Sequence, residues 1–135
     1  MTRKFIPTSE WQDQRQRQGL AGELEAMAYL TSCGWQVEAH RFRLGRHDVD
    51  LVVRRGRMVA FVEVKTRRST EFGTGIESIG WRKQRSIART ASLWALRHGR
   101  AGDEYRFDVV QVQWQAGKWA VEHVPDAFRP RESLI

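Results

Sequence analysis

The chain has 135 residues, the size of one ordinary domain and enough to form a single hydrophobic core. Its 41% hydrophobic residues, with six Trp and six Phe, exclude a disordered chain. The 23 Lys and Arg against 16 Asp and Glu give a formal net charge of +7. Most of the basic residues are arginine, whose planar guanidinium suits bidentate phosphate contacts, so this excess favours a polyanionic partner over a surface that only maintains solubility.

The cysteine content and the hydropathy limit where the protein works. A single cysteine, Cys33, excludes an intramolecular disulfide and a multi-cysteine zinc site, and it is typical of a reducing compartment. The sequence has neither a signal-peptide core nor an apolar run of about eighteen residues. We therefore expect a cytoplasmic protein without a membrane partner.

The periodic apolar segments define one domain with polar ends. Residues 1–16 are polar and rich in Gln and Arg, and they are predicted to form a flexible arm. Residues 17–128 form a single domain, and residues 129–135 form a loose tail. The domain contains no repeat, no Gly-rich phosphate loop and no Ser/His/Asp or Cys/His nucleophile arrangement.

A first helix is predicted from about Arg17 to Ser32, with Gly34 as its stop signal. Its apolar stripe contains Leu20, Leu24, Met27 and either Leu30 or Thr31. Glu23 falls inside this stripe. Two explanations are open: the carboxylate favours the N-terminal end of the helix dipole, or it points across to acidic residues of the sheet.

Three strands follow the helix. The first is predicted over residues 35–42, and it leads into a basic connector in which Arg43 and Arg46 are candidate phosphate contacts, a solvated connector being the alternative. Residues 48–53 and 58–64 form the next two strands, which meet in a hairpin. The run 58–62 is apolar on both faces, which is typical of a central buried strand.

The hairpin gathers charged residues at one end. Side chains two apart in a strand share a face, so Asp48 and Asp50 go together, as do Glu63 and Lys65. A two-residue turn that starts at Gly56 places Asp50 opposite Glu63 and Asp48 opposite Lys65. A turn at Arg55 and Gly56 is the alternative, which shifts the pairs by two residues but keeps all four side chains on one face. An ion-pair ladder is one interpretation. The other is a metal site, because clustered carboxylates repel one another unless a cation lies between them.

The metal-site interpretation gives each residue a role. Mg²⁺ commonly binds one or two carboxylates together with waters and phosphate oxygens. Asp50 and Glu63 would bind Mg²⁺ or Mn²⁺, with Asp48 as a further ligand. Lys65 would lie beside the attacking water, where its charge favours hydroxide or offsets negative charge in the transition state.

The segment after Lys65 is polar, basic and rich in glycine. Arg67 and Arg68 at its start are predicted to contact a phosphate backbone, an ordinary mobile loop being the alternative. A second helix is expected from Ser78 or Ile79 to Arg97. Basic and amide residues near its start are further candidate nucleic-acid contacts: Lys83, Gln84 and Arg85.

A last hairpin is predicted from residues 105–114 and 118–124. Asp108 lies in its first strand, two residues after Arg106. We favour an ion pair with an arginine for Asp108 over metal binding.

Several stretches of the sequence resemble the YraN family, a largely uncharacterised bacterial family similar in pattern to the restriction-endonuclease-like, PD-(D/E)xK, superfamily and its Holliday-junction-resolvase branch. They are residues 17–30, 48–52, 59–67, 71–73, 83–87 and 106–110. The resemblance implies a mixed α+β fold, a central mixed sheet flanked by helices in the order α-β-β-β-α-β-β. It also implies that the superfamily motif maps onto Asp50, Glu63 and Lys65, with Glu23 as the acid on the helix.

The chain departs from this family at one point of the motif. The family usually shows Gly-Glu-x-Asp where this sequence has His47-Asp48-Val49-Asp50. Asp48 keeps a carboxylate on a shorter side chain, and His47 places a ring where the family has glycine.

We therefore predict a Mg²⁺- or Mn²⁺-dependent endonuclease that hydrolyses DNA phosphodiester bonds, with branched DNA among its candidate substrates. The alternative is a nucleic-acid-binding protein on a nuclease scaffold without catalytic activity, and a third class is a protein-interaction adaptor. DNA is favoured over RNA as the partner, and a homodimer is left open.

Overall fold

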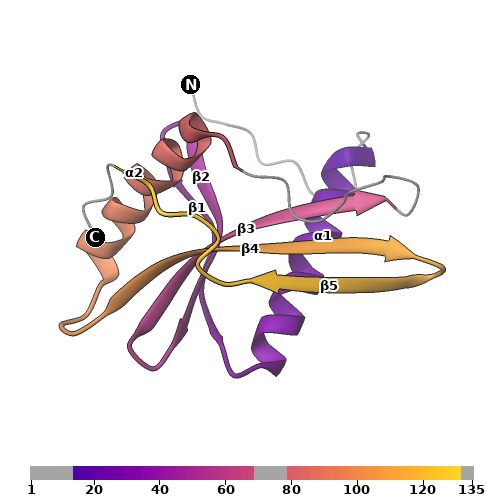
Figure 1. Ribbon diagram of the computed structural model, residues 1–135, viewed down its shortest axis with the longest axis horizontal. Helices are drawn as coiled ribbons and strands as arrows, with labels where there is room; N and C mark the ends of the chain where they lie inside the picture. Colours follow the sequence, from indigo (N-terminus) through magenta and orange to yellow (C-terminus); the bar gives the residue numbers. More distant parts are fainter. Residues whose placement is uncertain (1–13, 69–78, 132–135) are drawn as a thin grey trace, which may run out of the picture.

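The structure, a computed structural model, describes residues 14–68 and 79–131. These residues form two helices and five strands in the predicted order α-β-β-β-α-β-β (Figure 1). No helix in this part of the chain is long and apolar enough to cross a membrane. The elements are α1 (Gln14–Ser32), β1 (Gln36–Leu44), β2 (His47–Arg55), β3 (Met58–Arg68), α2 (Trp81–His98), β4 (Glu104–Gln115) and β5 (Lys118–Val124).

The five strands form one mixed sheet in the order β1-β2-β3-β4-β5. β1, β2 and β3 are antiparallel neighbours, and β4 and β5 form an antiparallel hairpin. β3 and β4 are parallel, and the crossover between them contains α2 (Figure 1). The strand that is apolar on both faces, β3, is therefore the central strand of the sheet, as predicted, and the mixed α+β fold is confirmed.

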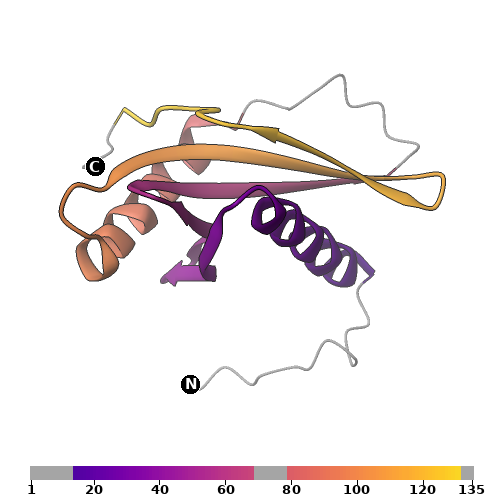
Figure 2. The same cartoon turned by 90° about the horizontal axis from the view of Figure 1, so that it is seen from below.

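The two helices pack on opposite faces of the twisted sheet. Alternate residues of β3 enter different cores: Val59 and Phe61 pack with α2, whereas Ala60 and Val62 pack with α1. Along the sheet, the helices lie toward opposite ends of the long strand β4 (Figure 2). The central strand is thus covered on both sides, and charged residues that follow its apolar run emerge between the two helices.

The predicted apolar stripe of α1 is wrong at Leu24, whose exposed fraction is 51%. The buried face instead contains Gly22, Ala26 and Leu30, which are spaced by four residues. A Cβ added at Gly22 would lie 2.1 Å from the Oγ1 of Thr66 on β3. The helix therefore turns its glycine toward the sheet, because only a residue without a side chain allows this close approach, and Leu24 turns to solvent as a result.

An ion cluster closes the end of the sheet near the β2–β3 turn. The buried Arg54 guanidinium donates to Asp103 Oδ1 at 2.6 Å from Nη1 and to Glu38 Oε1 at 2.7 Å from Nε. The hydrogen bond from Arg54, and a weaker effect of one from the backbone N–H of Arg100, lower the pKa of Asp103 to about 2. The cluster joins β1 and β2 to the turn before β4. It holds these strands together at this end of the sheet.

Candidate active site

β2 and β3 separate in the middle of the sheet. Their pairing begins at Arg55 and Met58, across a turn in which Gly56 has a φ of +61°, and it ends at Leu51 and Val62. This is the register predicted for a turn that starts at Gly56. Pairing between β3 and β4 continues beyond this point, so only the β2 side of β3 opens (Figure 1). We call this opening the fork.

Asp50 occupies the fork. Its Oδ2 accepts a hydrogen bond of 2.8 Å from the backbone N–H of Val64, a group that would otherwise face a continuing β2. β2 does not alternate strictly here, because Val49 and Val52, three residues apart, both enter the core under α2. Simple alternation, on which the prediction of a shared face for Asp48 and Asp50 rested, therefore does not hold along this part of β2, and the Asp50 side chain reaches along the sheet toward β3.

An irregularity of β1 accompanies this break in β2. Arg41, which lies across from Asp50 in the strand order, has a φ of +56°, in the left-handed region that non-glycine residues rarely adopt. Ala39 and Phe42, three residues apart, both pack against the α2-side core. The two strands therefore change face together without a shift of register, and Asp50 is directed into the fork.

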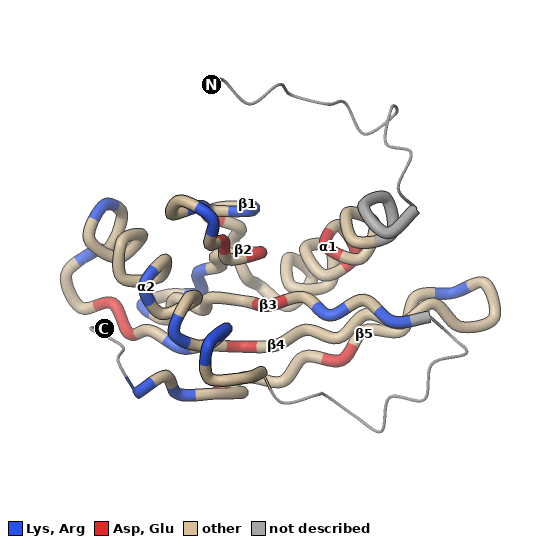
Figure 3. The backbone as a smooth tube through the Cα atoms, turned by 90° about the horizontal axis from the view of Figure 1, so that it is seen from above, with Lys and Arg blue, Asp and Glu red and all other residues tan. Residues whose placement is uncertain are grey.

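Glu63 and Lys65 lie on the face of β3 that α2 covers, because they continue the alternation of Val59 and Phe61. The Nζ of Lys83 on α2 lies 3.5 Å from Glu63 Oε1, which fixes the side to which Glu63 points. Figure 3 shows acidic segments of α1, β2 and β3 facing one another between the helices, with basic segments farther along β3. We call Asp48, Asp50, Glu63 and Lys65 the carboxylate site.

Burial and mutual repulsion raise the pKa values of the two central carboxyl groups. Burial, followed by the negative charge of Glu63, raises the pKa of Asp50 to about 8, although the hydrogen bond from Val64 opposes the shift. Burial also raises the pKa of Glu63, against the opposing charges of Lys83 and Lys65. Asp48 adds to the repulsion on both. At neutral pH the two carboxyl groups are therefore not both ionised unless a cation joins them.

Two buried oxygen atoms near this site have no hydrogen-bond partner among the described residues: Glu63 Oε2 and Gln111 Oε1. Gln111 pairs with Lys65 in the register of β3 and β4, and it lies on the face of β4 that Val109 directs toward α2. An unsatisfied buried acceptor costs about 1–3 kcal/mol. Oxygen atoms held in this way fit a hard cation such as Mg²⁺.

The protein alone does not complete a coordination sphere. In residues 14–68 and 79–131, no three His, Cys, Asp or Glu side chains are grouped closely enough to hold a metal ion. This agrees with the usual Mg²⁺ site, in which one or two carboxylates are supplemented by waters and substrate phosphate oxygens. The pair of Asp50 and Glu63, with the Gln111 oxygen beside it, fits such a site.

Glu23 approaches from α1 but is bound to β1. Its Oε1 lies 2.7 Å from His40 Nε2 and accepts a hydrogen bond of 2.9 Å from Arg41 Nε. Although burial raises the pKa of Glu23, the hydrogen bonds from Arg41 and His40 lower it below its ordinary value. The ionised Glu23 in turn raises the pKa of Asp50. Glu23 thus faces the sheet, but its hydrogen-bond partners are the basic His40 and Arg41 of β1 and not the acidic residues to which it was predicted to point.

The predicted DNA contacts differ in exposure. Arg43, Arg46, Lys83 and Arg85 are exposed, and Arg67 is half-buried two residues after Lys65. Arg67 and Arg85 take part in interactions within the protein. Lys83 pairs with Glu63, and the Gln84 side-chain amide donates to the Ile79 carbonyl at 2.7 Å. The side chain of Arg68 lies outside the described residues, as does the rest of the basic segment, 69–78.

Two other polar residues of the sequence have structural partners. The fully buried Asp108 accepts hydrogen bonds from Arg106 Nε at 2.8 Å and from the backbone of Asp126 at 2.9 Å, and it lies 2.7 Å from His123 Nε2. The predicted pairing of Asp108 with arginine is thus confirmed. His47 Nδ1 lies 2.5 Å from Ser86 Oγ, which joins β2 to α2 beside the carboxylate site.

Sequence reasoning missed Gln111. The signal was present, because Gln111 is the first amide at the alternating positions that follow Phe107 and Val109 in the apolar strand β4, and it is still within the buried part of that strand. An amide in such a position requires a partner, and β3 places Lys65 beside it.

The fold and the site together define a mixed α+β protein, a five-stranded sheet with one helix on each face, with carboxylates and lysines clustered at the middle of its central strands. The chain belongs to the uncharacterised protein family UPF0102, whose sequence profile matches residues 22–112. This is the YraN family that the motifs resemble.

Several bacterial relatives share most of the chain. A UPF0102 protein of Anaeromyxobacter dehalogenans is 41% identical over 116 residues, which cover 86% of this chain and 87% of the relative. One of Symbiobacterium thermophilum is 42% identical over 97 residues, 72% of this chain and 82% of the relative. One of Myxococcus xanthus is 32% identical over 115 residues, 85% and 91% of the two chains.

Proposed function

We propose that the protein is a divalent-metal-dependent endonuclease that hydrolyses DNA phosphodiester bonds, branched DNA included. The observation that carries this proposal is the pair of Asp50 and Glu63, two close carboxyl groups with raised pKa values, one of which has a buried oxygen without a described partner. Such a pair costs folding free energy unless it binds a cation. Perturbed carboxyl groups of this kind are typical of functional sites.

Each residue of the carboxylate site has a role in this proposal. Asp50 and Glu63 would hold Mg²⁺ or Mn²⁺, with the Gln111 amide oxygen as a further oxygen donor. Asp48, predicted as a third ligand, would contribute only its charge, because no three carboxylates of the described residues are grouped closely enough to hold one ion. A divalent ion bound there supplies an acidified water and a positive charge for the phosphate oxygens. Lys65 adds a second positive charge on the same face of β3, where it would favour hydroxide and offset charge that develops in the transition state.

The charge of the whole chain supports a nucleic-acid substrate. The net charge of +7 raises the local concentration of a polyanion and is carried mostly by arginine. The exposed Arg43 and Arg46 lie on β1 and the turn after it, next to β2 in the sheet. A DNA backbone that reaches the fork would therefore meet cations on the β1 side.

A specific contact favours a second candidate, a nucleic-acid-binding protein on the same scaffold without catalysis. Lys83 lies 3.5 Å from Glu63 and already offsets part of its charge, as a structural replacement for a metal ion would. This candidate shares the DNA affinity of the first. For both candidates, the logarithm of the DNA-binding constant should fall linearly with the logarithm of the salt concentration, with a slope of about −0.9 per neutralised phosphate. A protein adaptor with an incidental basic surface should not show this dependence.

The test is cleavage of labelled linear, nicked, flap and four-way DNA in Mg²⁺ or Mn²⁺. We expect the wild type to cut at least one structure, and Glu63→Gln to bind DNA but cut at least about 100-fold more slowly, a loss of about 3 kcal/mol of transition-state stabilisation. Glu104→Gln, the same change at an exposed position at the start of β4, is the matched control and should cut normally. Undiminished cleavage by Glu63→Gln would refute the assignment, and a wild type that binds but cuts nothing would favour the second candidate.

A further inference from the structure

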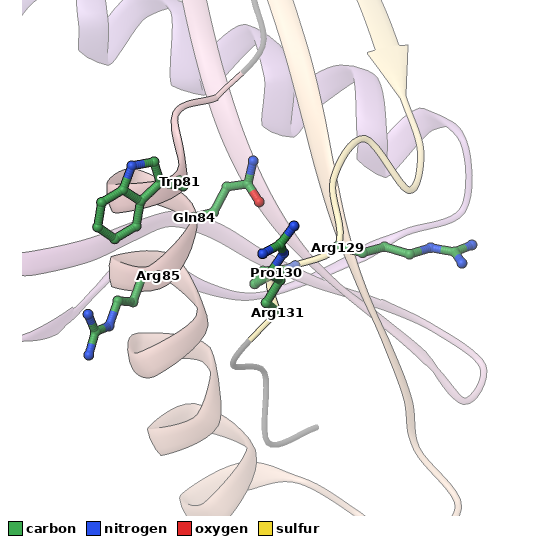
Figure 4. Close-up of a pocket in the computed structure, with 6 residues that line it drawn as sticks. All are labelled: Trp81, Gln84, Arg85, Arg129, Pro130 and Arg131. Carbon is green, nitrogen blue, oxygen red and sulfur yellow. The ribbon is translucent and has the colours of Figure 1, made fainter.

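A pocket of about 630 Å³ lies between the first turns of α2 and the C-terminal segment, apart from the residues of the carboxylate site. Figure 4 shows the six residues that line it. Three are arginines and none is acidic: Trp81, Gln84, Arg85, Arg129, Pro130 and Arg131. We call it the Trp81 pocket. Its volume lies within the range of small-ligand sites, roughly 300–1,000 Å³.

The C-terminal wall of the pocket is anchored to the sheet. The backbone N–H of Ala127 donates to the Phe107 carbonyl at 2.8 Å, and the rings of Phe128 and Phe107 lie 5.4 Å apart. Ala127 and Phe128 pack against the same core as α2. Pro130 lies two residues after Phe128 and therefore has a fixed position opposite the helix. The pocket is thus a preformed feature of the fold.

The packing of the described residues does not require a tryptophan at position 81. Its exposed fraction is 67%, whereas Trp35 and Trp94 are each 3% exposed and belong to the two cores. An indole in water contributes little to folding but offers a flat surface on which a nucleobase can stack, an interaction that tolerates any base. The Arg82 guanidinium already lies 5.6 Å from the ring centroid, which shows that a flat cationic group can reach this ring.

Guanidinium groups line the same pocket as this aromatic ring. Trp81 and Arg85, four residues apart, project from the same side of α2 (Figure 4). Arg131 adds a guanidinium from the C-terminal wall, whereas the Arg129 side chain points away from α2 and its Nη2 donates to Asp126 Oδ2 at 2.6 Å. An aromatic surface in a pocket with two further guanidinium groups matches one unpaired nucleotide, whose base stacks and whose flanking phosphates are anionic.

The pocket and the carboxylate site share one helical turn. Lys83, which lies 3.5 Å from Glu63, is two residues after Trp81, about 3 Å farther along the helix axis and about 200° around it. The two sites therefore lie on opposite sides of the start of α2, close enough for one DNA strand to reach both.

We propose that the Trp81 pocket binds an unpaired nucleotide of the DNA substrate and thereby selects DNA with a single-stranded segment near the site of cleavage. The choice of DNA as the ligand in this inference rests on the proposed function. A base inside a continuous duplex must be unstacked and unpaired before it can enter, whereas one in a flap, gap or junction arm is already available. The pocket thus gives the protein a preference for branched and gapped DNA over uninterrupted duplex.

The experiment measures binding without cleavage, so that it is independent of the nuclease proposal. Fluorescence anisotropy in EDTA gives the affinity of each protein for a labelled single-stranded oligothymidylate and for a blunt duplex of equal charge. We expect Trp81→Ala to weaken single-strand binding roughly 10- to 100-fold and to change duplex binding less than about twofold. Trp81→Phe should keep most of the single-strand affinity, and Arg131→Gln should lower the salt slope by about one.

Tyr29→Ala is the matched control, since it removes another exposed aromatic ring from the far helix α1. It should leave both affinities unchanged. Single-strand affinity of Trp81→Ala equal to that of the wild type, or an equal loss on duplex and single strand, overturns the pocket proposal. A selective loss in a protein that cuts no DNA upholds the pocket and rejects the nuclease, so the two failures are distinguishable.

Discussion

Asp50 makes the stability of the metal-free protein depend on pH. Its pKa is 3.8 in an ordinary environment and about 8 in the folded protein, where burial and the charge of Glu63 raise it. The folded state therefore keeps a proton that the unfolded chain releases between these pH values. The stabilisation from this proton is fully present below about pH 4 and is lost as the pH rises through about 8.

The size of this effect follows from linkage. Between pH 6 and pH 8, the folded state binds nearly one proton more than the unfolded state at this carboxyl group. Integration over this range gives a loss of about 2 kcal/mol in the free energy of unfolding. With a urea m-value of about 2 kcal/mol/M, the unfolding midpoint should fall by about 1 M between the two pH values.

Urea unfolding in EDTA, followed by circular dichroism, measures this loss in the wild type and in Asp50→Asn. The amide does not titrate and can still accept the Val64 hydrogen bond, so the variant should lose the pH dependence that Asp50 provides. Asp126→Asn is the matched control, because Arg129 lowers the pKa of this exposed carboxyl and it does not titrate in this range. Equal pH slopes for wild type and Asp50→Asn would refute the electrostatic description of the fork.

Three further substitutions test the surroundings of the site by urea unfolding. Gly22→Ala should cost about 1–3 kcal/mol, because its Cβ meets Thr66 Oγ1, and Thr66→Ala in the same chain should recover most of that loss. Arg54→Met should cost about 3–5 kcal/mol, because it leaves Asp103 charged and buried, and an effect below 1 kcal/mol would contradict the role of the ion cluster. Gln111→Leu should leave stability unchanged or raise it by about 1 kcal/mol while it slows DNA cleavage, and a large loss of stability would show that the amide has a structural partner.

The sequence was sufficient for those features that depend on local periodicity. The apolar run of β3 predicted its central place. Gly56 limited the hairpin to two registers, because a two-residue turn leaves little freedom of pairing, and the structure has the one in which the turn starts at Gly56. Glu63 and Lys65 followed from strand alternation. These inferences rest on backbone geometry that any chain with this pattern shares.

Features that depend on tertiary contacts were not accessible in this way. The face change in β2 arises with the left-handed Arg41 of the neighbouring strand, and no local signal marks it. The orientation of α1 depends on the approach of Gly22 to Thr66, which turned Leu24 outward against its hydrophobicity. The contact of Lys83 with Glu63 joins α2 to the sheet, and it requires the crossover geometry to be known.

The central claim, that Asp50 and Glu63 together bind a divalent cation, is tested most directly by calorimetric titration of the protein with Mn²⁺ at pH 8. The account predicts that the wild type binds Mn²⁺, that Lys65→Met still binds it, and that Glu63→Gln does not. Binding by the wild type should release protons and should weaken as the pH is lowered, because the pKa of Asp50 is about 8. A wild type that does not bind Mn²⁺, or a Glu63→Gln variant that binds it with undiminished affinity, would contradict the account.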